Sequence, residues 1–394
     1  MDLKAMAQSP IGQLVPISGS DPWRGEHYEH QAFVPDALPE RLEGLILSAE
    51  TWSAVVDAAA ALAKLDQAGR QVPNPELFRR PTLRREAQST SALEGTYAAF
   101  TDLLEADLDV GRPARSAEVR EVLNYVQAAE RAFEWIEDRP LTLVLLGELQ
   151  RILVRGTSGD LSDAGGVRDR QVVVGAQRRP ITESRYVPPP PGDVLQSSVE
   201  AWLRWLNAPS DIPHVVRAAL AHYQFESLHP FSDGNGRLGR LIVVLQLMRY
   251  EVLHYSLLIV SPWFEARRLE YQDALLTVSQ TGDFDPWIKF FSDGLRAQAD
   301  ETFLRIAELL DYQDELRALI RDRGIRGVRA QIMEGIVGQP IIAVPWAAQR
   351  HGVSYQAANE AIAKLVNAEI LEEMTGRNYD RLFAARRVLR IIED

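Results

Sequence analysis

Apolar residues recur every three to four positions through most of this 394-residue chain, and this spacing constrains the fold more than any other feature. Between positions 42 and 65, for example, Leu45, Trp52, Val55 and Ala59 would share one face of a helix. The same spacing predicts helices at 42–65, 80–93, 117–136, 141–153, 194–206, 214–228, 238–250, 265–280 and 286–321. The sequence therefore predicts a mainly α-helical protein.

Extended structure is predicted in one short region of the body. Residues 171–174 are Gln-Val-Val-Val and end at Gly175, and Tyr186-Val187 follows before a run of four prolines. Valines bounded by glycine and proline favour strands, so a small β-hairpin, or flap, is predicted here. Residues 1–40 are rich in Pro, Gly, Ser and His without a sustained period, which predicts extended coil.

The last 71 residues differ in character from the body. Short helices and then short extended segments are predicted in the order 326–336, 346–351, 354–368, 370–374 and 382–385. This order is typical of a winged helix-turn-helix. We accordingly expect an N-terminal helical region, a core, a connecting helix and a winged helix-turn-helix domain at 1–110, 111–300, 301–323 and 324–394.

Composition excludes several classes of protein. The chain has no cysteine, which excludes disulfides, thiolate catalysis and cysteine-ligated metals. Its net charge of −12 argues against a surface that binds nucleic acid or anionic lipid broadly. The N-terminus lacks a signal-peptide pattern, and the longest apolar runs are far shorter than the roughly 18–20 residues that cross a bilayer. We therefore expect a cytoplasmic protein without a membrane partner.

The most informative segment is His-Pro-Phe-Ser-Asp-Gly-Asn-Gly-Arg-Leu-Gly-Arg at 229–240, which joins two predicted helices. Gly234 and Gly236 leave backbone N–H groups at a helix start open to an anion. Arg237 and Arg240 are three residues apart and would share a helix face, which suits a polyphosphate.

The same segment supplies a metal ligand and a base. Asp233 offers the hard oxygen that magnesium prefers beside a phosphate. His229 titrates near neutral pH and can act as a general base. Together these residues predict a nucleotide–magnesium site that transfers a phosphate-containing group to a hydroxyl.

This segment resembles the core motif of the Fic family, His-Pro-Phe-x-(Asp/Glu)-Gly-Asn-Gly-Arg-x-x-Arg, at every fixed position. The resemblance implies a Fic-type helical core that transfers AMP from ATP to a Ser, Thr or Tyr hydroxyl of a protein and releases pyrophosphate. It also implies the following roles: His229 as base, Asp233 as magnesium ligand, Gly234, Asn235 and Gly236 on the α-phosphate, and Arg237 and Arg240 on the β- and γ-phosphates. Both glycines of the loop favour AMP transfer over the phosphorylating variant of the family.

Two further segments resemble the family's substrate-binding parts. The flap region resembles the segment that pins the target by strand pairing, which implies target contacts from Gln171, Val172, Val173, Val174 and Gly175. The segment 261–271 resembles the helix that flanks the adenine, which implies that Tyr271 contacts ATP. Core packing is the alternative for Tyr271, and Gln272 stands where many members carry a second aromatic residue.

A second motif, Thr90-Ser-Ala-Leu-Glu94-Gly95, resembles the family's inhibitory signature, Ser/Thr-x-x-x-Glu-Gly/Asn. Thr90 and Glu94 are four residues apart and would share a helix face. The resemblance implies that Glu94 pairs with Arg240 and denies that arginine to the γ-phosphate. In some members the same glutamate serves removal of AMP. The alternative is an ordinary surface glutamate at a helix end.

Two classes of function compete. The first is a self-inhibited adenylyltransferase whose target could include itself, working as a monomer or homodimer; an enzyme that mainly removes AMP is a variant of it. The second is a DNA-binding regulator in which the Fic core senses nucleotide. Residues 324–394 hold nine basic and eight acidic residues, net +1 against −13 for the rest, and this near-neutral charge disfavours DNA binding.

Overall fold

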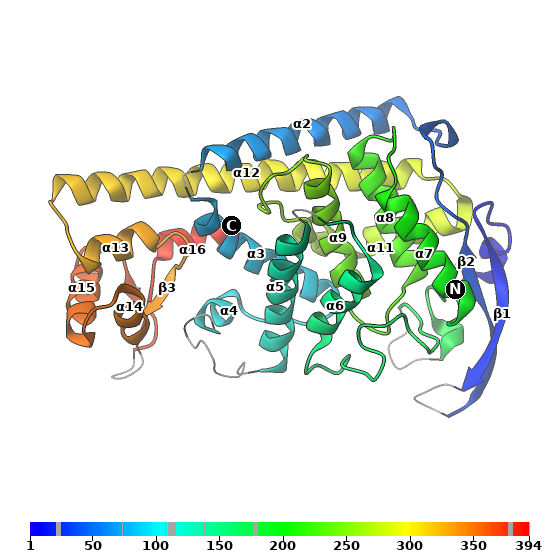
Figure 1. Ribbon diagram of the computed structural model, residues 1–394, viewed down its shortest axis with the longest axis horizontal. Helices are drawn as coiled ribbons and strands as arrows, with labels where there is room; N and C mark the ends of the chain where they lie inside the picture. Colours follow the sequence, from blue (N-terminus) through cyan, green and yellow to red (C-terminus); the bar gives the residue numbers. More distant parts are fainter. Residues whose placement is uncertain are drawn as a thin grey trace.

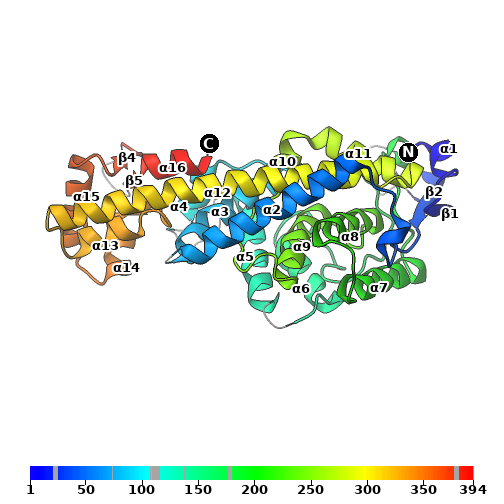
Figure 2. The same cartoon turned by 90° about the horizontal axis from the view of Figure 1, so that it is seen from above.

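The computed structural model describes residues 1–20, 25–72, 74–106, 108, 116–136, 139–175, 180–376 and 381–393. The molecule is elongated and mostly helical, as Figure 1 and Figure 2 show, which confirms the predicted class. The longer helices are α2 (Ala49–Gln71), α3 (Pro75–Leu93), α5 (Ala117–Ile136), α6 (Leu143–Val154), α7 (Asp193–Asn207), α8 (His214–Leu228), α9 (Asn235–Arg249), α11 (Arg268–Thr281), α12 (Asp285–Asp322) and α15 (Tyr355–Asn367). Shorter ones are α1 (Leu3–Met6), α4 (Phe100–Ala106), α10 (Ser261–Ala266), α13 (Val328–Gly335), α14 (Val344–His351) and α16 (Arg386–Glu393), with 3₁₀ turns at Leu42–Gly44 and Ile181–Glu183.

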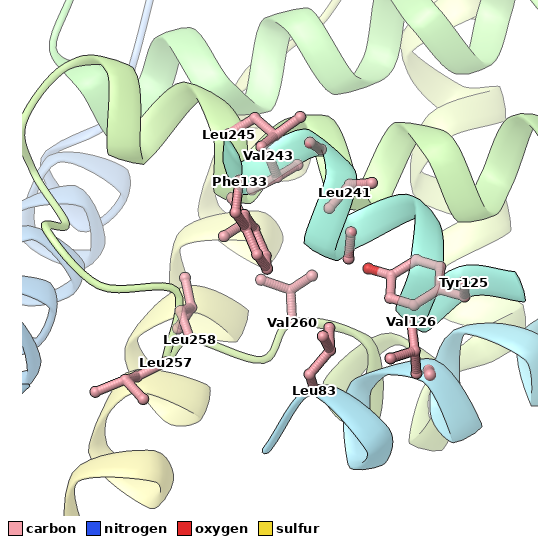
Figure 3. Packing of buried hydrophobic residues seen from close by; sticks show 14 of the residues in the cluster. Leu83, Tyr125, Val126, Phe133, Leu241, Val243, Leu245, Leu257, Leu258 and Val260 are labelled. Atoms are coloured by element: carbon pink, nitrogen blue, oxygen red, sulfur yellow. The ribbon is translucent and has the colours of Figure 1, made fainter. Parts of the chain in front are cut away.

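The core of the protein surrounds α8 and α9. Nearly every residue of α9 is buried, and residues 241–245 are all apolar, so this part of the helix faces the core on all sides. Figure 3 shows Leu241, Val243 and Leu245 of α9 close to Phe133 of α5 and Val260. Because α8 ends at Leu228 and α9 begins at Asn235, the motif loop lies between two rigid, buried elements.

α12 extends along most of the molecule, and α2 packs beside part of it in the same direction (Figure 1, Figure 2). The Ser48 N–H donates to Asp285 at the N-terminal ends of the two helices, and Lys64 pairs with Asp300 further along both. The Ser48 hydroxyl accepts the N–H of Thr51 at 3.2 Å and caps α2, so the helix starts later than the predicted Leu42. The proposed connecting helix at 301–323 is the second half of α12. No helix in the described part of the chain is both long and apolar enough to cross a bilayer.

Two helix predictions were wrong in their boundaries. α3 starts at Pro75 rather than at Arg80-Pro81, and Pro81 lies inside the helix. Proline suits the first helical position, so Pro75 initiates the helix, and tertiary packing of the following turns accommodates the interior proline. The predicted helix at 265–280 is two helices, α10 and α11, separated at Arg267, whose ψ of 35° departs from helical geometry.

The prediction of extended coil for residues 1–40 was also wrong. β1 (Gly12–Ser20) and β2 (His27–Pro35) form an antiparallel hairpin with nine paired positions. The hairpin depends on distant contacts, because Ala32 and Phe33 are fully buried and the Phe33 N–H donates to the Val187 carbonyl at 2.9 Å. Such tertiary support leaves little local signal in the sequence.

The flap has less strand pairing than the predicted hairpin. Val174 and Tyr186 form an isolated antiparallel bridge, with the Val174 N–H donating to the Tyr186 carbonyl at 2.9 Å. Residues 176–179, in the middle of the segment, lie outside the described residues.

The C-terminal region combines four helices with a small antiparallel sheet. The strands β3 (Ile341–Ala343), β4 (Glu372–Glu373) and β5 (Leu382–Ala384) lie in the order β3-β5-β4. β3 and α16 are additions to the predicted elements, and the winged helix-turn-helix identity of this region stays a prediction. α16 packs on α12 and α3, and β3 packs on α4, so this region touches the helix that ends at Glu94.

We expect Gly338→Ala to destabilise the contact between the C-terminal region and α3. A Cβ at Gly338 would lie 2.8 Å from Leu77 Cδ2 and 3.0 Å from the Leu77 backbone, which leaves no room for it. Such overpacking costs about 1–3 kcal/mol, seen as a lower thermal midpoint. The control is Gly335→Ala, where a Cβ meets nothing within 4 Å. Equal midpoints for the two variants would contradict this packing.

Candidate functional site

The loop between α8 and α9 is held by its own side chains. Gly234, at φ +82°, caps α9 in the left-handed conformation that favours glycine. The Asn235 amide spans the loop: its Oδ1 accepts the Phe231 N–H at 2.9 Å and its Nδ2 donates to the Phe231 carbonyl at 2.7 Å. Asn235 therefore fixes the shape of the loop, while Gly234 leaves the N–H groups at the start of α9 uncovered by a side chain.

A cavity of about 790 Å³ opens beside this loop. Its lining includes seven residues predicted from the sequence: Glu94, Val174, Gly175, His229, Gly236, Arg240 and Tyr271. Among the described residues, Thr90, Gly95, Gln171, Val172, Val173, Asp233, Gly234, Asn235 and Arg237 are not part of that lining. The structure thus brings together parts of the motif, the inhibitory signature, the flap and the adenine segment.

Glu94 and Arg240 form the ion pair expected between α3 and α9. Arg240 Nη2 donates to Glu94 Oε1 at 2.7 Å, and Arg240 Nε donates to the Thr90 hydroxyl at 2.7 Å. Arg240 is 2% exposed, whereas the Glu94 side chain is 40% exposed and faces the cavity. Burial alone would raise the pKa of Glu94, but Arg240 outweighs it and holds the pKa below its usual value.

Two glycines make this contact sterically feasible. A Cβ on Gly236 would lie 2.0 Å from Glu94 Oε1, so only glycine lets the carboxylate approach the start of α9. Gly95 has φ +95° and follows directly after Glu94, where it ends α3.

His229 is uncharged at neutral pH. Burial and, to a smaller extent, the charge of Arg168 lower its pKa to about 4, although Glu94 acts in the opposite direction. Its Nδ1 is buried without a hydrogen-bond partner in the part of the chain that the structure describes. The residue lines the cavity, so a neutral imidazole lies where a target hydroxyl would enter.

Arg237 does not accompany Arg240 into the cavity. It is 2% exposed and pairs with Glu121 of α5 at 2.8 Å and with Asp233 at 3.2 Å. In this structure Arg237 is thus held by carboxylates, whereas Arg240 lines the cavity. That both arginines bind phosphate stays a prediction.

Asp233 fits a single-carboxylate metal site. Its side chain is 41% exposed, and one oxygen accepts the Gly234 N–H at 2.5 Å. Among the described residues, no group of three or more acidic or histidine side chains could hold a metal ion by itself. Magnesium commonly uses one or two carboxylates together with substrate phosphates and waters, so this donor set suits a metal that arrives with a nucleotide.

Tyr271 both lines the cavity and packs in the core, so the two alternatives for it coexist. Its hydroxyl lies 2.8 Å from His222 Nε2, and the ring packs against Phe264 and Trp287. Burial lowers the pKa of His222 to about 3, so this histidine is also neutral. No sequence motif had pointed to His222.

Four other charged residues at the site had no role predicted from the sequence. Glu226 lies in the cavity wall, and burial raises its pKa to about 7. Arg185 and Arg268 also line the cavity, and Arg185 pairs with Asp273. Arg168 is 1% exposed, and its guanidinium donates to the His229 carbonyl. Glu226 lies three residues before His229 and Arg168 three residues before Gln171, and this closeness to the predicted segments was the available signal.

A helical core that presents a histidine, a glycine-rich helix start and a buried arginine to one cavity defines the Fic class of protein. Residues 52–134 match the Fic/DOC family N-terminal region, and residues 140–247 match the Fic/DOC family. The chain is a Fic-domain protein.

Curated relatives and solved structures agree with this assignment. The chain is 36% identical over 173 residues to Protein adenylyltransferase Fic of Culex quinquefasciatus, covering 42% of this chain and 31% of that one. It is 29% identical over 293 residues to the protein of the same name from Drosophila ananassae, covering 71% and 51%. The matches thus span a third to a half of these relatives' length.

Two solved structures share the fold at low identity. A Fic family protein from Desulfovibrio desulfuricans G20 superposes with a TM-score of 0.56 at 22% identity, covering 86% of this chain and 97% of that one. A segment of Fic-1 from C. elegans gives 0.51 at 20% identity, covering 66% and 74%. At this identity the likeness concerns the fold alone.

Proposed function

We propose that this protein is a self-inhibited protein adenylyltransferase that transfers AMP from ATP to a Ser, Thr or Tyr hydroxyl. The observation that carries the proposal is the shared cavity of His229, Gly236 and Arg240, closed by Glu94. The adenylyltransferase names of the relatives support the same reaction for the matched region.

In the proposed reaction, the hydroxyl oxygen of the target attacks the α-phosphorus of ATP. The bond from that phosphorus to the oxygen bridging to the β-phosphate breaks, and pyrophosphate leaves. The neutral His229 takes the hydroxyl proton, which its low pKa permits at neutral pH. N–H groups at the start of α9 stabilise the charge on the α-phosphate oxygens.

Two side chains would handle the distal phosphates and the metal. Arg240 would bind the γ-phosphate once Glu94 has left it, because a guanidinium pairs equally well with carboxylate and phosphate. Asp233 would hold magnesium, which supplies positive charge to the phosphates when bound. Arg237 would support Asp233 from behind, at 3.2 Å, rather than bind phosphate in the observed conformation.

The test uses two labelled forms of ATP with magnesium and the Glu94→Gly variant, incubated alone and with a cell lysate. The proposal predicts protein labelling from α-labelled ATP and none from γ-labelled ATP, because pyrophosphate carries the γ-label away. Labelling from γ-labelled ATP would indicate phosphoryl transfer instead. No labelling from either form would contradict a transferase.

Removal of AMP is a second candidate, and one observation favours it. Glu94 lines the same cavity as His229 and is 40% exposed there, so its carboxylate could orient a water. The wild-type protein should then release AMP from a protein labelled by the Glu94→Gly variant, and Glu94→Gly should not. Cytoplasmic location stays a prediction from the sequence, self-modification and a homodimer stay open alternatives, and DNA binding stays disfavoured by the charge of residues 324–394.

A further inference from the structure

Arg168 has an environment that its place in the sequence does not explain. The side chain is 1% exposed, and its three described partners are carbonyl oxygens rather than carboxylates. A buried guanidinium is expensive to desolvate, and burial lowers the pKa of Arg168 to about 10, so it remains charged at neutral pH. Because the buried charge of Arg168 costs desolvation free energy, we expect its hydrogen bonds to have a role beyond packing.

The three hydrogen bonds of Arg168 join the catalytic loop to the flap. Nε donates to the His229 carbonyl at 2.8 Å, Nη1 to the Arg170 carbonyl at 2.9 Å, and Nη2 to the Pro189 carbonyl at 2.6 Å. The backbone N–H of Arg168 adds a fourth bond, to the Pro230 carbonyl at 2.9 Å. Arg168 thus holds the backbone of His229 and both ends of the flap segment in fixed positions relative to one another.

The backbone of His229 needs such support. Its φ of +48° is left-handed, a conformation that costs a residue with a Cβ on the order of 1–2 kcal/mol. Such a conformation persists only where the surroundings hold it. The Phe225 carbonyl accepts the His229 N–H at 2.9 Å on one side, and Arg168 holds the carbonyl on the other.

We propose that Arg168 is a positioning residue for the adenylyl transfer step: it aims the His229 imidazole at the hydroxyl of a target pinned by the flap. This inference rests on the proposed function. Arg168 does not line the cavity in the described part of the chain, so it acts through His229 and the flap rather than on ATP.

The effect of the Arg168 charge on the pKa of His229 can be separated from the effects of neighbouring charged groups. The other charged or titratable residues that share the cavity with His229 are Glu94 from α3, Glu226 from α8, Arg240 from α9, Arg268 and Tyr271 from α11, and Arg185 and Tyr186 from the flap segment. Glu94 opposes Arg168 at His229, so the experiment is done in the Glu94→Gly background, where that opposing charge is absent.

Two variants distinguish the hydrogen-bond geometry of Arg168 from its charge. Arg168→Lys keeps the charge but cannot reach three carbonyls that lie in different directions. We expect the rate of label incorporation at saturating α-labelled ATP to fall at least tenfold, while ATP affinity measured by calorimetry stays within twofold. Arg168→Gln removes the charge, so the pKa of His229 should rise toward 6.5, whereas in Arg168→Lys it should stay near the parent value.

The pKa is measured by NMR titration of the histidine rings, with the His229→Ala variant identifying the signal among the seven histidines. The matched control is Arg217→Lys, because Arg217 is also buried and donates only to carbonyls, those of Trp205 and Ala208, away from the cavity. It should lose thermal stability as Arg168→Lys does and keep both the labelling rate and the His229 pKa.

Three results bear on the inference in different ways. An unchanged His229 pKa in folded Arg168→Gln, or a parental labelling rate in Arg168→Lys, would overturn it. If Arg168→Gln does not fold, the rate and affinity of Arg168→Lys decide. If the Glu94→Gly parent incorporates no label, the proposed function fails, whereas the NMR titration still tests the action of Arg168 on His229.

Discussion

Replacing Glu94 by glycine should raise incorporation of α-labelled AMP roughly 30- to 1000-fold. In the wild-type protein the γ-phosphate must displace a carboxylate that holds a 2%-exposed arginine at 2.7 Å. Breaking one side of such a buried pair costs about 2–4 kcal/mol, and each 1.36 kcal/mol in the barrier is a factor of ten. The measurement is the initial rate of labelling with magnesium and saturating ATP.

The control for this prediction lies on the same helix. Glu76 is in the first turn of α3, where its 60%-exposed side chain pairs with Arg79 at 2.7 Å. Glu76→Gly should leave the labelling rate unchanged, because an exposed pair contributes little and Glu76 is not part of the cavity lining. An equal increase in both variants would show that loosening α3, rather than freeing Arg240, causes activation.

A second readout tests the freed arginine directly. Without Glu94, Arg240 is buried and keeps only uncharged observed partners in the described residues, Thr90 and Tyr271, so Glu94→Gly should melt at a lower temperature than wild type. ATP with magnesium should then raise the midpoint more in the variant than in wild type, because the phosphate replaces the lost carboxylate.

Replacing His229 by alanine in the Glu94→Gly background should lower the labelling rate about 10²–10⁴-fold, the usual contribution of a general base. Among the described residues no other histidine lines the cavity, because His222 is buried outside the lining and bonds to Tyr271. His254→Ala, at an exposed site beside Asp66, should retain the full rate. Full activity of His229→Ala would remove the base from the mechanism.

The pH profile of Glu94→Gly distinguishes a buried base from a solvated one. Burial and Arg168 place the pKa of His229 near 4, and loss of Glu94 lowers it further because Glu94 had raised it. A base is active when deprotonated, so the rate should stay level from pH 8 down to about 6 and fall only in more acidic solution. A fall centred on pH 6.5 would indicate a solvated histidine.

The local signals in the sequence were sufficient for most of the longer helices and for recognising the motif. Periodicity identified the helical class, and the spacing of Thr90 and Glu94 placed both on the helix face that meets Arg240. Where distant parts of the chain decide the outcome, local patterns failed. The β1–β2 hairpin forms because Phe33 is buried against the flap segment, which no pattern within residues 1–40 could reveal.

The two arginines of the motif separate what the sequence predicts from what the tertiary structure decides. The sequence by itself predicted a polyphosphate-binding segment, a base and an inhibitory carboxylate, because each depends on residue type and short-range spacing. Only the tertiary structure decided that Arg240 faces the cavity while Arg237 turns to Glu121, and that Arg168 stands behind His229. The reason is that a buried charged side chain needs polar partners, and here distant segments of the chain supply them. Those segments become neighbours only when the chain is folded.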